Sequence, residues 1–182
     1  MGVTSAHASR VIIEPAGVMR LDSVGRLTFT AEGTTIECAF ASRWNISRNS
    51  EGTLSEAPEA RNPRIGTMTE GAFRECTGGT IVELLSSSPL KYIYGRVVGH
   101  PEQFAMWTLH EYLVDDGLLF RCLYGLKITY IFELRTAQLR ARETITLFQT
   151  PLFPGSCKSN PRIAGVNKLE DGRGGTPRIE LS

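Results

Sequence analysis

The chain has 182 residues, of which 41% are hydrophobic and 21% are charged, and its formal net charge is +1. This ordinary globular composition excludes wholesale disorder. A charge so close to zero excludes strong overall attraction to nucleic acid or to an anionic membrane, and neither is expected as a partner. No apolar run in the sequence approaches the roughly 18 residues that a membrane-spanning helix needs.

The first part of the chain predicts a short arm followed by strands. Residues 1–9 are small and polar, and we expect them to form an extended N-terminal arm. Turn-forming residues then separate three short predicted strands, at 10–14, 17–22 and 26–31. Glu32-Gly33 favours a turn into a fourth strand, 34–42, whose alternate residues share one face. The segments on either side of this turn predict a β-hairpin.

The middle of the chain begins with a polar stretch, 49–62, which predicts a long loop of the kind that functional or partner-ordered segments form. Strand patterns then resume at 64–68, 72–76, 80–85 and 91–98. Segment 104–114 fits either a strand or a helix. The turn sequence Asp115-Asp116-Gly117 favours a strand that leads into another at 118–123.

Alternation is clearest at 126–134, where Ile128, Tyr130, Phe132 and Leu134 lie two apart. Together with 139–148 this segment predicts another hairpin. Because the same period of two recurs along most of the chain, the sequence predicts an all-β protein. We expect an antiparallel β-sandwich or barrel whose body spans residues 10–149.

Prolines and glycines punctuate residues 150–182, and only 162–166 and 178–181 keep a strand pattern. We expect an extended C-terminal arm. Its last strand, Arg178, Ile179, Glu180 and Leu181, is predicted to add to the sheet edge of a neighbouring molecule. On this interpretation, deletion of 168–182 leaves the body folded and abolishes assembly.

A four-residue pattern, Asn/Thr-Pro-Arg-Ile, occurs at 62–65, 160–163 and 176–179. Proline fixes φ and lacks an N–H group, so it suits the residue just before a strand. The pattern therefore predicts three similar strand entries.

Four cysteines, Cys38, Cys76, Cys122 and Cys157, lie too far apart for a zinc-binding motif. Cys38 and Cys122 each fall within a predicted strand, among hydrophobic residues on the same face. Two such cysteines can form an inter-sheet disulfide in an oxidising compartment, and they equally fit buried free thiols. The sequence leaves both interpretations open, and also the pairing of the cysteines.

No catalytic, cofactor or metal site is predicted. His110-Glu111 begins a zinc-peptidase pattern, but Val114 occupies the position where the second histidine would lie. The three histidines, His7, His100 and His110, leave one enzymatic hypothesis. It is a hydrolase whose nucleophile, histidine and carboxylate meet only in the folded chain.

Several short motifs follow one another in a recognisable order. They are Gly25-Arg26-Leu27-Thr28-Phe29, Thr34 to Cys38, Phe73 to Gly79 and Cys122 to Gly125. This order, which covers about residues 25–134, resembles small secreted β proteins of actinobacteria. The resemblance implies β architecture and disulfides, and it implies no activity.

The absent catalytic motifs, neutral charge and expected arms favour a non-catalytic structural subunit. Virion decoration, capsid-associated and tail proteins are of this type, and they bind copies of themselves or another structural protein in a virion or other extracellular assembly. The alternative is a secreted, disulfide-linked β-module. It would bind a carbohydrate or a cell surface through aromatic residues concentrated in the middle of the chain.

Overall fold

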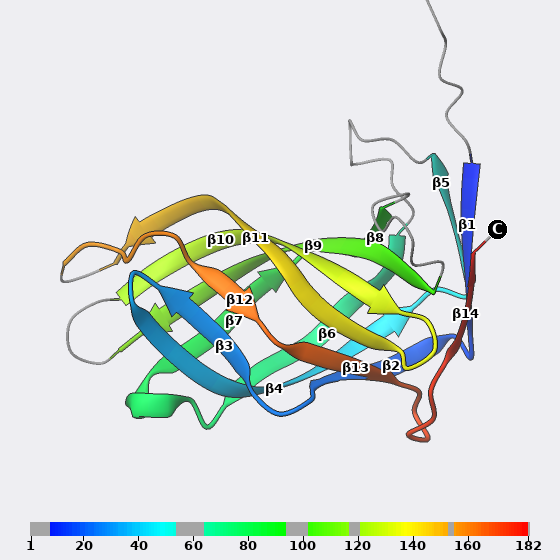
Figure 1. The fold of residues 1–182 in the computed structure, drawn as a ribbon, viewed down its shortest axis with the longest axis horizontal. Helices are drawn as coiled ribbons and strands as arrows, with labels where there is room; N and C mark the ends of the chain where they lie inside the picture. Colours follow the sequence, from blue (N-terminus) through cyan, green and yellow to red (C-terminus); the bar gives the residue numbers. More distant parts are fainter. Residues whose placement is uncertain (1–7, 54–63, 94–101, 117–120, 153–154, 182) are drawn as a thin grey trace, which may run out of the picture.

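The computed structural model describes residues 8–53, 64–93, 102–116, 121–152 and 155–181. These residues form β-strands joined by turns and by one short 3-10 turn, Thr77–Gly79, so the all-β prediction is confirmed (Figure 1). The strands are β1 (Ala8–Glu14), β2 (Gly17–Ser23), β3 (Leu27–Ala31), β4 (Thr34–Ile46), β5 (Asn49–Thr53), β6 (Arg64–Arg74), β7 (Ile81–Ser87), β8 (Leu90–Ile93), β9 (Gln103–Asp115), β10 (Arg121–Glu133), β11 (Gln138–Pro151), β12 (Arg162–Ala164), β13 (Val166–Glu170) and β14 (Arg178–Leu181).

Eight of these strands close into an antiparallel barrel. Around the ring their order is β2, β4, β6, β8, β9, β10, β11 and β13, and the pairing of β13 with β2 closes it. The structure therefore selects the barrel from the two architectures that the sequence allowed.

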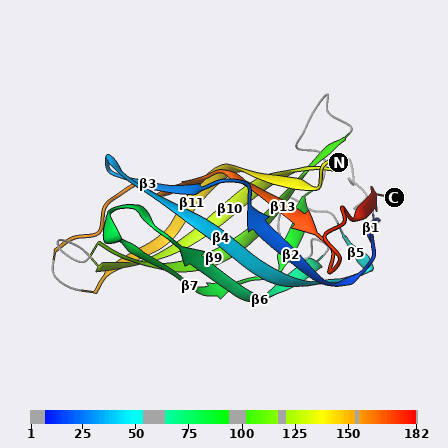
Figure 2. The same cartoon turned by 90° about the horizontal axis from the view of Figure 1, so that it is seen from below.

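The longest strands extend beyond the closed ring. There β4 pairs with β3, which pairs with β12, and on the other side β9 pairs with β7. The molecule is consequently elongated, with β3, β7 and β12 toward one end (Figures 1 and 2). The hairpin that was predicted around Glu32-Gly33 is confirmed, because Leu27 to Ala31 pair with Thr34 to Cys38.

A separate three-stranded sheet, in the order β14, β1, β5, lies at the opposite end of the molecule (Figure 1). Val11 and Ile13 of β1 are almost fully buried, and both belong to the main hydrophobic cluster. Ile179 of β14 joins the same cluster. This small sheet therefore packs onto the end of the barrel core.

The expected C-terminal arm is wrong for residues 162–181. Within this stretch β12 pairs with β3, β13 lies between β11 and β2, and β14 pairs with β1. Ile163 and Leu169 are buried in the core. The segment is ordered because each of its short strands fills a position beside an early strand of the same chain. Of the expected N-terminal arm, residues 1–7 lie outside the described residues, whereas Ala8 and Ser9 begin β1.

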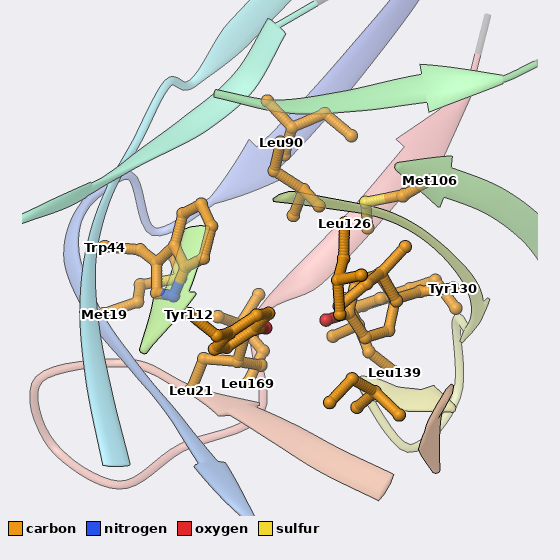
Figure 3. Packing of buried hydrophobic residues seen from close by; sticks show 14 of the residues in the cluster. Met19, Leu21, Trp44, Leu90, Met106, Tyr112, Leu126, Tyr130, Leu139 and Leu169 are labelled. Atoms are coloured by element: carbon orange, nitrogen blue, oxygen red, sulfur yellow. The ribbon is translucent and has the colours of Figure 1, made fainter. Parts of the chain in front are cut away.

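One continuous core runs through the barrel, and it follows directly from residue alternation. Every second residue of β4 points inward, from Ile36 to Ile46. In β10, Leu126, Ile128 and Phe132 are fully buried. Figure 3 shows Trp44 and Tyr112 among leucines and methionines contributed by several strands. The Ser42 hydroxyl accepts a hydrogen bond from the buried Trp44 indole N–H at 2.9 Å. The same hydroxyl donates a hydrogen bond to the Leu21 carbonyl at 2.6 Å.

Two predicted strand breaks are absent from the structure. Residues 64–74 form the single strand β6, and β10 passes without interruption through Gly125. Gly125 is needed there because a Cβ at this position would lie 2.2 Å from the Phe148 ring of β11. The glycine thus makes room for a neighbouring aromatic side chain. Segment 104–114, which fitted either a helix or a strand, lies in β9.

Candidate functional site

The four cysteines form two disulfides, Cys38–Cys76 and Cys122–Cys157. Of the two interpretations that the sequence left open, buried free thiols are therefore wrong. Each mid-strand cysteine pairs with a cysteine outside the strands rather than with the other mid-strand cysteine. The two bridges indicate an oxidising, extracellular environment.

The predicted partner-binding strand, Arg178 to Leu181, pairs in register with β1 of its own chain. Ile179 lies opposite Ile13 and is buried, while the side chains of Arg178 and Glu180 form an ion pair with each other. Because β14 is an edge strand of its small sheet, binding to a neighbouring molecule stays a prediction. Its observed contacts are nevertheless with its own chain, through β1 and the main hydrophobic cluster.

Of the three histidines, His7 and His100 lie outside the described residues. His110 is buried in the barrel wall, and burial lowers its pKa from 6.5 to about 3 even though it donates a hydrogen bond to the Ser86 carbonyl. Its Nδ1 atom has no hydrogen-bond partner within the described part of the chain. A histidine so hard to protonate and so far from solvent is poorly suited to hydrolytic chemistry at neutral pH.

The barrel interior is filled with side chains. The cavity lined by His110, Asn167 and their apolar neighbours has a volume of about 20 Å³. Such a space admits about one water molecule, far below the size of an organic ligand. Of the aromatic residues that could have stacked on sugars, those whose burial the structure describes, such as Tyr112, Tyr124 and Phe132, are themselves core residues. Among the described residues, no three His, Cys, Asp or Glu side chains are grouped so that they could hold a metal ion.

The surface feature that stands out is the second half of β11. Along one edge this strand pairs with β10 over its whole length. Along the other edge β13 pairs only with Gln138 to Arg140, and the last contact with β12 is the hydrogen bond from Ile163 N to Thr144 Oγ1 at 3.1 Å. From Ile145 onward, this edge has no strand partner among the residues that the structure describes.

Large apolar side chains are exposed on this open stretch. Ile145, Leu147, Phe148 and Leu152 are 44%, 52%, 39% and 47% exposed, and they make up half of the exposed large hydrophobic residues in the described ranges. We call this segment, residues 145–152, the β11 edge. An exposed strand edge with apolar side chains is the usual starting point for pairing with another chain.

The outer face of the neighbouring strands carries a small apolar cluster that is itself buried. Ile145 lies opposite Lys127 of β10, on the side that faces away from the core. Beyond Lys127 lies a small outer cluster of Ala105 and Trp107, with Leu109 and Ile131 packed against it. The Lys127 Nζ atom is 5.0 Å from the Trp107 ring centroid, so its alkyl stem lies along this cluster while its charge contacts the ring.

The β11 edge contains no charged residue, and neither do the residues that flank it in the sequence. Between Glu143 and Lys158 the chain contains no Asp, Glu, Lys or Arg. Edge strands are normally protected by such charges. This absence is the sequence signal that could have located the site, whereas the strand pattern alone assigned residues 139–148 to an ordinary hairpin.

Comparison with known proteins gives no relative for this chain. No family model matches it, no curated protein matches it and no solved structure matches it. Within the described residues, the structure also contains no helix that is long and apolar enough to cross a membrane.

Proposed function

We propose that the protein is a non-catalytic structural subunit of an extracellular assembly, and that it binds a second copy of itself through the β11 edge. The observation that carries this proposal is the open, uncharged, apolar second half of β11. Two copies would place their β11 edges antiparallel about a two-fold axis, so that main-chain hydrogen bonds join the two sheets.

The choice of a second copy rests on the charge pattern. When a strand pairs antiparallel with itself, residues near the symmetry axis lie opposite the same residues of the partner. Any charge there meets its like, which is unfavourable. The uncharged run between Glu143 and Lys158 avoids this repulsion. The same run offers no charges by which a differently charged partner could be selected.

The bulge in β11 limits where pairing can occur. The register with β10 shifts between Phe148 and Thr146, so Leu147 is the extra residue. Pro151 then ends the stretch that can donate backbone hydrogen bonds. The pairing segment is therefore short, and burial of Ile145, Phe148 and Leu152 has to supply much of the affinity.

A lysine at position 147 tests the proposal. Leu147 is 52% exposed, so Leu147→Lys should leave the fold intact while two lysines approach each other at the two-fold axis. We expect the wild-type chain to form dimers in light scattering, and the variant to dissociate at concentrations about tenfold higher or more.

The matched control is Val18→Lys on β2, since Val18 is 63% exposed and lies outside the β11 edge. This variant should dimerise like the wild type. A wild-type chain that stays monomeric at every accessible concentration, or equal dissociation of both variants, would contradict the proposal.

A further inference from the structure

The outer face of β2, β4 and β6 carries a hollow of about 300 Å³, at the small end of the range for ligand sites. These three strands lie side by side on the underside of the molecule (Figure 2). We call this hollow the arginine trough. Its outward-facing residues are Arg20 and Asp22 from β2, Ala41 and Arg43 from β4, and Glu70, Ala72 and Arg74 from β6.

Small side chains form the floor of the trough. Ala41 lies in register with Asp22 on one side and with Ala72 on the other. Two neighbouring methyl groups on adjacent strands leave the space that longer side chains would fill. The next residue of β4, Ser42, points into the core. The hollow is therefore a property of the outer face alone.

The rim is rich in guanidinium groups. Arg20 and Arg43 lie opposite each other in the β2–β4 register, an arrangement that is unfavourable unless each charge is compensated. Both are compensated: Arg20 pairs with Asp22, and Arg43 Nη1 lies 3.5 Å from Glu70 Oε2.

Arg74 differs from these two arginines. It lies opposite Ala39, and within the described part of the chain it has neither an ion pair nor a side-chain hydrogen bond. The trough thus holds three guanidinium groups and two carboxylates, which leaves one uncompensated positive charge at Arg74. A guanidinium group binds a carboxylate through two parallel hydrogen bonds.

A second, smaller hollow of about 160 Å³ adjoins the trough and shares Glu70 and Gly71 with it. It follows the seam between β6 and β7. Three hydroxyl residues, Thr69, Ser86 and Ser87, line this seam beside Met68, Leu84 and Leu85. The two hollows together can accommodate an extended ligand with a charged end and a neutral, hydroxylated remainder.

We propose that the arginine trough and the adjoining seam bind an acidic oligosaccharide, with one sugar carboxylate on Arg74. Sugar hydroxyls both donate and accept hydrogen bonds, and the site offers both kinds of partner: arginine N–H groups and the carboxylates of Asp22 and Glu70. An acidic peptide would bring several negative charges close to these two carboxylates. This site is separate from the β11 edge, so neither proposal depends on the other.

Calorimetric titration of the full chain with 3′-sialyllactose, a trisaccharide with a single carboxylate at one end, tests the proposal at low ionic strength. We expect saturable binding, and no binding of maltotriose, which has a similar size and no charge. Arg74→Gln should weaken sialyllactose binding about tenfold or more. Arg140→Gln, the same charge change at an exposed position of β11, should leave the affinity unchanged.

A second variant tests the shape of the site without a change in charge. Ala72→Leu fills the floor of the trough from an outward-facing position and should abolish binding. Equal weakening by the two arginine variants would show that only overall charge matters and would overturn the proposal. Binding of triglutamate as tightly as sialyllactose would overturn the assignment to a sugar.

Discussion

At the scale of single residues, His110 is a titratable group that the fold removes almost completely from water. It lies in the wall of the barrel, 4% exposed, with its ring 5.5 Å from that of Tyr112. Burial lowers its pKa, so the folded chain resists a proton that the unfolded chain accepts readily. The same burial raises the pKa of Tyr112 and of Tyr130 and keeps both phenols neutral.

This depressed pKa predicts a specific dependence of stability on pH. Between pH 6.5, the unfolded value, and about 3, the folded value, the unfolded state binds one more proton at His110 than the folded state does. The free energy of unfolding should therefore fall as pH falls below 6.5, at a rate approaching about 1.4 kcal/mol per pH unit.

His110→Gln removes this titration while keeping an N–H donor for the Ser86 carbonyl. Urea unfolding measured between pH 7 and about 5, above the range where most carboxylates titrate, should show a flatter pH dependence in the variant. Parallel curves for the two proteins would show that His110 is protonated as easily in the folded chain as in the unfolded one.

At the scale of elements, the two disulfides hold segments that few other contacts fix. Cys122 lies in β10, and its bridge holds the segment before β12. In that segment the Tyr124 hydroxyl donates to the Lys158 carbonyl at 3.0 Å, and the Ser159 hydroxyl donates to Glu32 at 3.1 Å. Among the described contacts that hold this segment, the disulfide is thus the only covalent one.

Paired alanine variants measure what each bridge contributes. The cysteines are 38 and 35 residues apart, so constraint of the unfolded chain predicts a similar stabilisation of about 4 kcal/mol for each bridge. We expect C38A/C76A and C122A/C157A each to lose about this much in urea unfolding. Reductant should then destabilise each variant less than it destabilises the wild type. A double variant that unfolds at the wild-type urea concentration would show that its bridge contributes nothing.

Strands that pair with a neighbour in sequence were predictable. The hairpin around Glu32-Gly33 and the strand β9 follow from alternation and turn residues. The Pro-Arg-Ile pattern also predicted strand entries correctly, since β6, β12 and β14 each begin at its arginine and bury its isoleucine. These features depend on local sequence, which a single chain displays directly.

Strands that depend on distant partners were not predictable. β12 has only three residues, and it is a strand because it pairs with β3; Thr28 donates to the carbonyl of Ala164, 136 residues away. A run of three residues contains no sequence signal for a partner so distant in the chain. The open half of β11 was missed for the converse reason, because alternation describes the residues of a strand and not which of its edges is paired.

At the scale of the whole molecule, the barrel depends on both ends of the chain. β13 closes the ring against β2, and β14 pairs with β1. Residues that the sequence assigned to a detachable arm therefore complete the hydrophobic core, with Leu169 and Ile179 both buried.

Two truncations separate the contribution of β13, which closes the ring, from that of β14, which pairs with β1. Deletion of 168–182 removes most of β13 and all of β14, so we expect loss of cooperative unfolding in thermal denaturation, opposite to the sequence-based expectation. Deletion of 178–182 leaves the ring complete and should give a less stable protein that still unfolds cooperatively. That shorter chain should also dimerise through the β11 edge. If it folds but stays monomeric, β14 rather than β11 forms the contact between copies.

The pairing of β13 with β2 also has a consequence for biosynthesis. The two strands are far apart in the sequence, so the ring cannot close until β13 has left the ribosome. Until then the early strands expose surface that the mature protein hides. A polypeptide whose barrel closes so late is suited to passage through an export channel in an unfolded state.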